Sequence, residues 1–325
     1  MASMLKIDGL SVRLPHEGEM ASVVERISFE VGRGEFVGLV GESGSGKSIT
    51  ARSLIRLLPS GAETVGSIRL DDLDVLSLSD RELRGLRSTK AAMIFQDPRA
   101  HVDPLWRVAD HIAEPLRLRD LGDDVIRAQS REMLDAVGIA DPDHCLDAYP
   151  DQLSGGMLQR VMIAGALIAE PELLIADEPT TALDVTTQAE IMGILADLKR
   201  DRDLATLFIT HDLELASAIC DRVLVMYAGT IVETGPCVEV FERQLNPYTW
   251  GLLRARPSLT GPVGNLEVIP GQPVSGLEAP SGCPFEPRCA WSTDRCAEVR
   301  PPLEEVRPGR RTACIRIGEI ADELR

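Results

Sequence analysis

The glycine-rich segment at residues 41–48 limits most strongly what this chain can fold into. It reads GESGSGKS, which has the spacing G-x-x-x-x-G-K-[ST], and it follows the apolar run at residues 36–40 directly. Residues 47–58 have helical composition and end before Pro59. A strand, a glycine-rich turn and a helix in this order form the context in which such a loop holds phosphate. We therefore predict an α/β fold with a phosphate-binding loop.

The chemistry expected of this loop follows from its residue types. Glycines let backbone N–H groups turn inward around a β-phosphate, and the following helix adds a favourable dipole. Lys47 is expected to reach the β- and γ-phosphates, and Ser48 to give a hydroxyl to Mg²⁺. A turn that matches by chance is the alternative, and the flanking strand and helix argue against it. The predicted ATP contacts are Gly41, Glu42, Ser43, Gly44, Ser45, Gly46, Lys47, Ser48 and Ile49.

A second apolar run, residues 173–176, ends in two acidic residues, Asp177 and Glu178. Asp177 fits a partner of Mg²⁺ that acts through water, and Glu178 fits a base that polarises the attacking water. Two adjacent carboxylates after a strand would otherwise be an ordinary exposed loop. Together with the phosphate loop, they predict hydrolysis of the bound nucleotide.

The rest of the chain predicts a mostly parallel sheet with insertions. Residues 5–14 and 23–31 indicate N-terminal strands, and apolar strands at 91–95, 205–209 and 223–226 alternate with helical stretches. Residues from about 106 to 149 are helical and polar, as in an inserted helical subdomain placed at about 100–168. After residue 256 the chain becomes rich in proline. We predict one domain over residues 1–256 and a small extension over 257–325, which is either draped on the domain or held by its cysteines.

Charge and hydropathy exclude several classes of protein. The net charge is −17, with 51 acidic against 34 basic residues, which argues against binding to nucleic acid and to anionic lipid. The sequence contains no run of the roughly 18 apolar residues that a membrane-spanning helix needs, and no signal-peptide core. We therefore expect a cytoplasmic protein that reaches a membrane only through partners.

Residues 153–160, LSGGMLQR, decide the family. Ser154 is a natural N-cap for the helix that follows, and the segment resembles the signature sequence of ABC-transporter ATPases. Further matches are Gln96 after a strand, Ala182-Leu183-Asp184 after the acidic pair, and His211 after a strand. The resemblance implies an ABC-type P-loop ATPase, with a mostly parallel core sheet, an N-terminal antiparallel β subdomain and an inserted helical subdomain.

The resemblance also implies roles for these residues. In the family, two ATPase domains enclose two ATP molecules head to tail, so that the signature residues Ser154, Gly155, Gly156 and Gln159 would meet the ATP bound by the partner. Gln96 would sense Mg²⁺ and the attacking water. His211 would hold the γ-phosphate, and Asp184 would contact the partner. Leu14 stands where the family often has an aromatic ring against adenine, so adenine would rest on an aliphatic surface.

Several segments resemble the oligopeptide/dipeptide (and nickel) importer branch. They are AMIFQDP at 92–98, IADEPTTALDV at 175–185, VMYAG at 225–229 and NPYT at 246–249. The branch implies peptide import, a second homologous ATPase as partner in a heterodimer, two transmembrane permease subunits and an extracytoplasmic binding protein. The chain would then lie at the cytoplasmic face of the membrane. Nickel import is the alternative. A non-transport ABC ATPase would predict tandem ATPase domains or a basic surface, and the sequence has neither.

Four cysteines fall in the proline-rich extension: Cys283, Cys289, Cys296 and Cys314. Their spacings of five, six and seventeen residues match neither the short pairs of structural zinc sites nor ferredoxin patterns. The residues alone therefore indicate four possible thiolate ligands. The tail resembles that of peptide-importer ATPases, which implies a [4Fe–4S] cluster, with zinc as the alternative and free thiols or a disulfide after it. An iron–sulfur redox protein with an incidental nucleotide fold is disfavoured by the complete hydrolysis motifs.

Overall fold

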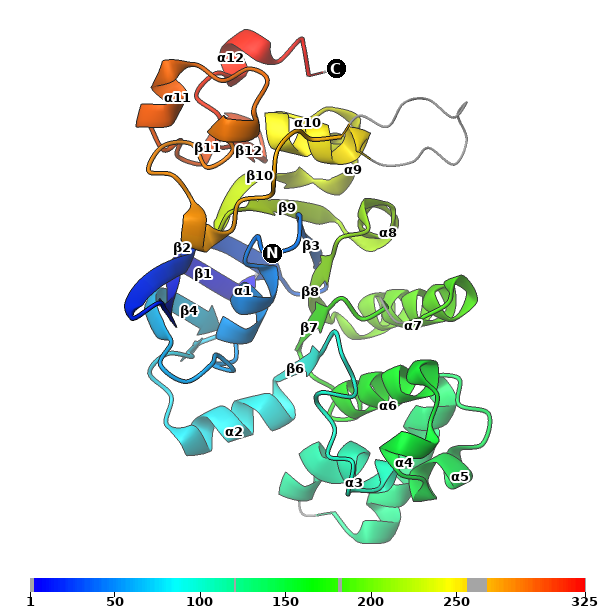
Figure 1. Cartoon of the computed structure of the whole chain (residues 1–325). Coiled ribbons are helices and arrows are strands. Elements are labelled where there is room, and N and C mark those ends of the chain that lie inside the picture. Colours follow the sequence, from blue (N-terminus) through cyan, green and yellow to red (C-terminus); the bar gives the residue numbers. More distant parts are fainter. Residues whose placement is uncertain (1–2, 120, 181–182, 256–267, 325) are drawn as a thin grey trace. The chain divides into compact units, whose positions relative to one another are not determined.

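The chain folds into two compact units, which are best described separately (Figure 1). The computed structural model describes residues 3–119, 121–180, 183–255 and 268–324. The first unit contains residues 1–5, 30–36 and 69–209, and the second contains residues 6–29, 37–68 and 210–325. The predicted domain boundary at residues 256 and 257 lies outside the described residues, as does Ala182, so the division into domain and extension stays a prediction.

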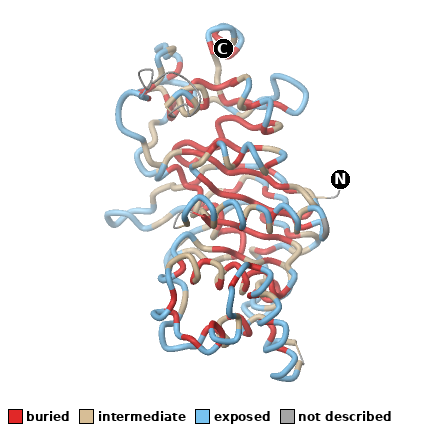
Figure 2. The backbone as a smooth tube through the Cα atoms, turned by 90° about the vertical axis from the view of Figure 1, so that its right-hand side faces the viewer, coloured by how far each residue is buried: buried red, intermediate tan, exposed pale blue. Residues whose placement is uncertain are grey.

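Three parallel strands form the sheet of the first unit. They are β6 (Ala91–Ile94), β7 (Leu173–Asp177) and β8 (Ala205–Thr210), and β7 pairs with both of the others. Every residue of β7 and β8 is buried, and Figure 2 shows buried residues following the strands. Burial on both faces explains why these strands appear in the sequence as continuous apolar runs.

Helices make up most of the remaining first unit. α3, α4, α5 and α6 pack on one another within the range predicted for the helical subdomain. The helices are α2 (Asp80–Thr89), α3 (Val108–Ala113), η1 (Glu114–Leu118), α4 (Asp123–Ala136), α5 (Pro142–Asp147), η2 (Pro150–Gln152), α6 (Gly155–Leu167) and α7 (Val185–Arg202). The predicted N-cap at Ser154 is confirmed, because its Oγ accepts the Met157 N–H at 3.3 Å.

The predicted N-terminal strands are also present. β1 (Ser3–His16), β2 (Glu19–Gly32) and β4 (Glu63–Leu70) lie in the order β2-β1-β4, and β5 (Leu73–Asp74) pairs antiparallel with the end of β4. β1 and β2 are joined by a tight turn at residues 17–18 and form a hairpin. This is the N-terminal β subdomain that the sequence predicts.

The second unit has a sheet that continues into the extension. β3 (Phe36–Val40) pairs in parallel with β9 (Arg222–Tyr227), and β9 pairs antiparallel with β10 (Thr230–Pro236). β10 then pairs with β12 (Arg310–Thr312), and β12 with β11 (Glu304–Arg307). The extension is therefore joined to the sheet by backbone hydrogen bonds, in addition to any contribution from its cysteines.

The helices of the second unit are short. They are α1 (Lys47–Ser53), α8 (Leu213–Ile219), α9 (Cys237–Glu242), α10 (Pro247–Arg254), η3 (Gly276–Glu278), η4 (Glu286–Arg288), α11 (Asp294–Glu298) and α12 (Ile317–Ile320). The helix predicted over 47–58 ends at Ser53, and Arg56 takes a positive φ of 52°, which a continuing right-handed helix cannot contain. No helix in the described ranges is long and apolar enough to cross a membrane.

A small apolar core supports the extension. Leu245, Ile317, Ile320 and Leu324 form one buried cluster, and the rings of Trp250 and Trp291 pack at its edge, with ring centroids 5.1 Å apart. This core is small, as the proline-rich composition predicts. It nevertheless packs α12 against the residues around α10.

Candidate functional site

The phosphate loop lies between β3 and α1 in the second unit, and its shape requires glycine. Gly41 has a φ of +153°, and a Cβ there would lie 2.1 Å from the Met226 carbonyl oxygen. Gly46 has a φ of +103°, and a Cβ there would lie 3.1 Å from the Val23 carbonyl oxygen. Positive φ together with close backbone neighbours leaves no room for a side chain. The pattern of glycines in the sequence is thus explained by backbone contacts.

The side chain of Lys47, near the end of the loop, folds back onto the residues at the start of the loop. Its side chain is buried, and Nζ donates to the carbonyl oxygens of Gly41 at 2.8 Å and Glu42 at 2.9 Å. Nζ also lies 3.4 Å from Ser45 Oγ. The ammonium group therefore lies inside the loop, where a bound phosphate would compete with these carbonyl oxygens for it. Ser48 and Ile49, which follow, are half-buried.

The acidic pair and the predicted glutamine meet in the first unit. Asp177 is buried at the end of β7, and Gln96 Nε2 donates to Glu178 Oε2 at 2.9 Å. Glu178 takes a φ of +48°, and its N–H donates to the Ile209 carbonyl at 3.0 Å. A non-glycine residue held in the left-handed region costs energy, and such strain is concentrated at functional sites. The structure thus brings together the predicted water-polarising base and the residue predicted to sense the water.

The signature segment presents its first turn to solvent but keeps its glutamine inside. Ser154 is exposed, and a Cβ on Gly155 would meet no atom within 4 Å. Gln159, by contrast, is buried, and its Nε2 donates to the Pro179 carbonyl at 2.7 Å. Gln159 therefore ties the signature helix to the backbone that follows Glu178. Its predicted contact with a partner's nucleotide stays a prediction, and this burial disfavours it.

The remaining predicted residues lie as follows. Asp184 caps α7 by accepting the N–H groups of Thr186 and Thr187, and the hydrogen bond from the Thr187 backbone is the main reason that its pKa is lowered. His211 is exposed between β8 and α8, and Leu14 is half-buried near the end of β1. The loop, Leu14 and His211 belong to the second unit. Gln96, the acidic pair, the signature residues and Asp184 belong to the first.

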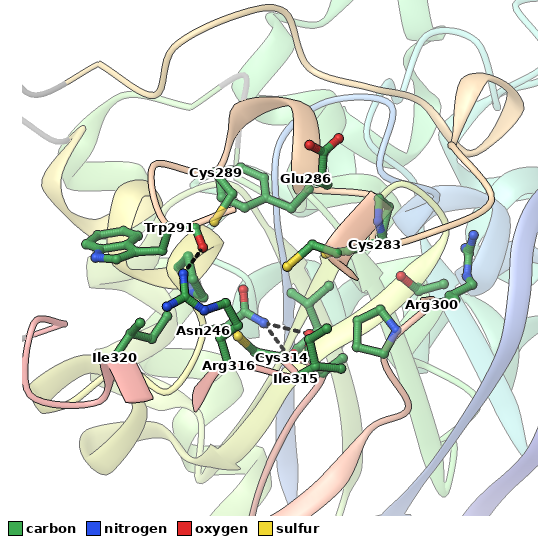
Figure 3. A pocket seen from close by; sticks show the side chains of 18 of the residues that line it. Asn246, Cys283, Glu286, Cys289, Trp291, Arg300, Cys314, Ile315, Arg316 and Ile320 are labelled. Carbon is green, nitrogen blue, oxygen red and sulfur yellow. Dashed lines mark hydrogen bonds between the residues drawn. The ribbon is translucent and has the colours of Figure 1, made fainter. Parts of the chain in front are cut away.

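The four cysteines of the extension line one cavity of about 50 Å³. Figure 3 shows the sulfur atoms of Cys283, Cys289 and Cys314 pointing toward this space. Burial raises the pKa of Cys283, raises that of Cys289 to about 12 and raises that of Cys314 to about 11. Burial therefore favours the protonated form of each of these three thiols.

The cavity does not have the geometry of a single-ion site. Within the described part of the chain, no three His, Cys, Asp or Glu side chains come close enough together to hold one metal ion. All seven cysteines are free thiols, so the predicted alternative of a disulfide is not formed in this structure. The donor set is still soft and complete for a metal–sulfur group, with four thiols on one cavity.

Sequence reasoning missed two residues that contact the phosphate loop. Tyr248 accepts the Glu42 N–H at 2.8 Å, and Arg288 donates to the Glu42 carboxylate. Tyr248 lies within the NPYT segment, and Arg288 directly precedes Cys289. Tyr248 was therefore inside a recognised segment and Arg288 beside a recognised cysteine, but nothing in local spacing connects either with a loop more than two hundred residues away.

Known proteins of similar sequence carry the same combination of an ATPase part and a C-terminal extension. A family model described as "ABC transporter" matches residues 24–181, and one described as "Oligopeptide/dipeptide transporter, C-terminal region" matches residues 232–296. The chain is 44% identical over 315 residues to the oligopeptide transport ATP-binding protein OppD of Escherichia coli, covering 97% of this chain and 93% of the relative. It is 42% identical over 314 residues to the dipeptide transport ATP-binding protein DppD of the same organism, covering 96% of each.

Solved structures of ABC transporter proteins also resemble the fold of this chain. A dimeric bacterial ABC transporter cassette is similar with a TM-score of 0.66 and 27% identity, covering 72% of this chain and 99% of that one. The cbiO1 protein of Clostridium perfringens, part of an ABC transporter complex, is similar with a TM-score of 0.62 and 29% identity, covering 74% and 92%. The chain therefore belongs to the ATP-binding proteins of ABC transporters, in the oligopeptide/dipeptide transport branch.

Proposed function

We propose that this chain is the ATP-hydrolysing subunit of an importer that takes up dipeptides and oligopeptides. The observation that carries the proposal is likeness over nearly the whole chain, extension included. The oligopeptide transport relative matches 97% of the chain, and the model for the C-terminal region of oligopeptide/dipeptide transporters begins at β10. A generic nucleotide fold would match in the ATPase part alone.

ATP and Mg²⁺ are held in this proposal by the loop and the acidic strand end. Lys47 exchanges the carbonyl oxygens of Gly41 and Glu42 for phosphate oxygens, and Ser48 and Asp177 hold Mg²⁺. Glu178 accepts the proton of the attacking water, while Gln96, which already donates to its carboxylate, orients that water. Positioning and electrostatic stabilisation supply most of the rate in phosphoryl transfer.

A second ATPase completes the site. One cassette with the same fold is known as a dimer with ADP and phosphate bound. The exposed N-terminus of α6, with Ser154, Gly155 and Gly156, supplies N–H groups that suit the γ-phosphate of an ATP bound by a partner. Asp184 contacts that partner, and His211 holds the γ-phosphate. We propose a homologous but different chain as the partner, giving a heterodimer.

In this proposal ATP binding and hydrolysis drive a conformational change of the transporter. Two transmembrane permease subunits hold the ATPase pair at the cytoplasmic face of the membrane, and an extracytoplasmic binding protein delivers the peptide. ATP closes the pair, and hydrolysis and product release reopen it. In this proposal the chain reaches the membrane through these partner subunits.

The cysteine cavity suits a [4Fe–4S] cluster held by Cys283, Cys289, Cys296 and Cys314. Four sulfurs on one zinc ion, about 2.3 Å from it, lie only about 3.8 Å apart, and the described thiols form no such tight group. Four thiolates suit either metal, and the cluster is preferred over zinc because the tail resembles that of peptide-importer ATPases. Such a cluster would supply four metal–sulfur bonds that crosslink the extension. The cysteines must lose their protons to bind it, and burial, which raises the pKa of Cys283, Cys289 and Cys314, adds to the cost of that step.

Reconstitution tests the proposal directly. The chain is co-purified with its permease and ATPase partners, and the complex is placed in vesicles with a binding protein. ATP-driven uptake of labelled di- and oligopeptides is expected, and uptake of nickel without peptides would replace the proposed cargo. Protein prepared without oxygen is expected to be brown and to contain about four irons per chain. Colourless protein with stoichiometric zinc would refute the cluster.

A further inference from the structure

One arginine of the extension reaches the phosphate loop. Arg288 Nη1 donates to Glu42 Oε2 at 2.7 Å, and Nη2 donates to Oε1 at 3.2 Å. The side chain of Arg288 is 4% exposed and that of Glu42 is 22% exposed. Both residues belong to the second unit. A two-pronged pair between a guanidinium and a carboxylate restricts orientation as well as distance, so this contact defines where the Glu42 side chain lies.

Glu42 is held at three points, and one of them is the catalytic lysine. Its N–H donates to Tyr248 Oη at 2.8 Å, its carbonyl accepts from Lys47 Nζ at 2.9 Å, and its carboxylate accepts from Arg288. Because Glu42 is the second residue of the loop, these contacts set the path of the backbone that will surround the phosphates. They also fix the position of the Glu42 carbonyl oxygen, one of the two backbone acceptors that Lys47 would exchange for phosphate oxygens when a nucleotide binds.

Arg288 itself has little freedom to move. Its Nε donates to the Pro270 carbonyl at 2.9 Å, and Nη1 lies 3.3 Å from Tyr227 Oη. The guanidinium carbon lies 5.8 Å from the ring centroid of Tyr227 and 5.9 Å from that of Phe285. These neighbours hold the buried guanidinium in the orientation in which it donates to the Glu42 carboxylate.

The same arginine is attached to the cysteine cavity through the backbone. It is the last residue of η4 (Glu286–Arg288), and Cys289 follows it directly. The Arg288 N–H donates to Phe285 O at 3.0 Å, and the Cys289 N–H donates to Glu286 O at 3.1 Å. Phe285 lines the cavity, as do Glu286, Cys283 and Cys289 (Figure 3). A rearrangement at the cavity must therefore move the segment that carries Arg288.

We propose that Arg288 is a positioning residue of the ATP site, which fixes Glu42 at the start of the phosphate loop. It thereby links ATP affinity to the conformation of the 283–289 segment, which lines the four-cysteine cavity. The inference rests on the proposed binding of ATP at this loop. Coupling between two sites is reciprocal in free energy. If the ordered 283–289 segment raises the affinity for nucleotide by some factor, bound nucleotide must therefore favour the ordered form of that segment by the same factor.

The first experiment measures nucleotide affinity in the full chain. Binding of a fluorescent ATP analogue with Mg²⁺ is titrated at a temperature where circular dichroism shows every variant folded. Arg288→Met is expected to weaken binding about five- to twentyfold, within the usual range for coupled sites. Arg288→Lys is expected to lose part of this, because one ammonium cannot serve both carboxylate oxygens. Unchanged affinity in a folded variant overturns the proposal, and Arg288→Lys carries the test should Arg288→Met fail to fold.

Two further variants separate positioning from general stabilisation. Arg310→Met removes another buried arginine of the extension, which bonds to Glu233, Glu239 and Arg243 and lies outside the lining of the cysteine cavity, and its affinity is expected to equal that of the unaltered chain. The pair Glu42→Gln and Arg288→Met is expected to weaken binding by less than the product of the two single effects. Equal losses in Arg310→Met and Arg288→Met would show that the extension only stabilises the fold, and would refute a specific role for Arg288.

The reciprocal experiment uses hydrogen exchange. Mg²⁺–ATP is expected to slow exchange of the Arg288 and Cys289 amides by about five- to twentyfold in the unaltered chain, and to leave them unchanged in Arg288→Met. The same slowing in both chains overturns the link. Lys47→Ala distinguishes the two levels of the argument. If it binds ATP normally, the proposed function fails; if it loses binding while Arg288→Met keeps full affinity, only the present inference fails.

Discussion

The phosphate loop and the C-terminal extension each bury cations, and they satisfy them in opposite ways. Lys47 donates to the carbonyl oxygens of Gly41 and Glu42, five or six residues before it. The buried arginines of the extension, Arg288 and Arg310, pair with carboxylates 246 and 77 residues away. The loop is a local device whose geometry is contained in its own residues. The extension instead depends on carboxylates that only the folded chain brings near.

The buried pair of Arg310 and Glu233 illustrates the second case. The two side chains are 2% and 0% exposed, and Nη2 lies 2.6 Å from Oε1. Arg310 also donates to the carbonyl oxygens of Glu239 and Arg243. Such pairs add little net stability when intact, but removing one partner leaves a charge without compensation in the interior. The difference between the regions is thus one of vulnerability, and mutations can test it.

The largest expected effect lies on catalysis at the locally encoded side. Glu178→Gln is expected to reduce ATP turnover by about a hundred- to ten-thousandfold, because the amide cannot accept a proton from water. Binding of ATP is expected to stay intact, as measured by nucleotide titration beside a phosphate-release assay. Glu170→Gln is the matched control, since Glu170 also has a positive φ, at 52°, but pairs with Arg202 on the surface. Ordinary turnover in Glu178→Gln would remove Glu178 as the base.

The next effect lies on the stability of the extension. Arg310→Met is expected to lower the free energy of unfolding by about 3–5 kcal/mol, because it strands the Glu233 carboxylate in the interior. Denaturant titration measures the change. Arg311→Met is the control, since Arg311 is the exposed neighbour on the same strand, and it is expected to change stability by less than about 0.5 kcal/mol. Equal losses in the two variants would show that the extension does not depend on the buried pair.

A smaller effect tests whether the loop is as self-contained as its motif suggests. Gly41→Ala is expected to cost about 1–3 kcal/mol, because it places a Cβ against the Met226 carbonyl oxygen. ATP affinity should fall with it. Gly155→Ala, whose Cβ would meet nothing within 4 Å, is expected to leave stability of the chain unchanged, as followed by thermal unfolding. A harmless Gly41→Ala would mean that the loop adapts, and that its glycines are not required by contacts.

The smallest effect concerns pH. The hydrogen bonds at the start of α7, first that from the Thr187 backbone, lower the pKa of Asp184. A carboxylate with a lowered pKa in the folded state stabilises the fold above its unfolded pKa, and this contribution is lost as the pH falls through the folded value. Asp184→Asn, which keeps a good cap, is expected to change the melting temperature little at pH 7 and to flatten its decline below about pH 4. An unchanged acid profile would exclude this residue as a contributor.

Much of the fold could be predicted because its signals are local. Strand β3 and the N-cap Ser154 follow from apolar runs and capping chemistry over a few residues. The hydrogen bond between Gln96 and Glu178 joins residues 82 apart, yet it was foreseeable because both follow parallel strands that end at the same edge of a sheet. The early end of α1 at Ser53 was not foreseeable, because no breaker residue stands there.

The sequence by itself determined the chemistry of this protein: the phosphate loop, the acidic pair, the signature helix and four thiols on a proline-rich extension. Only the tertiary structure decided how the extension is held, that it reaches the loop through Arg288, and that Tyr248 of α10 contacts the same loop. The physical reason is that glycine conformations, helix caps and strand burial depend on near neighbours in the chain. A buried arginine needs a carboxylate at hydrogen-bond distance, and which carboxylate arrives there depends on the folding of the whole unit.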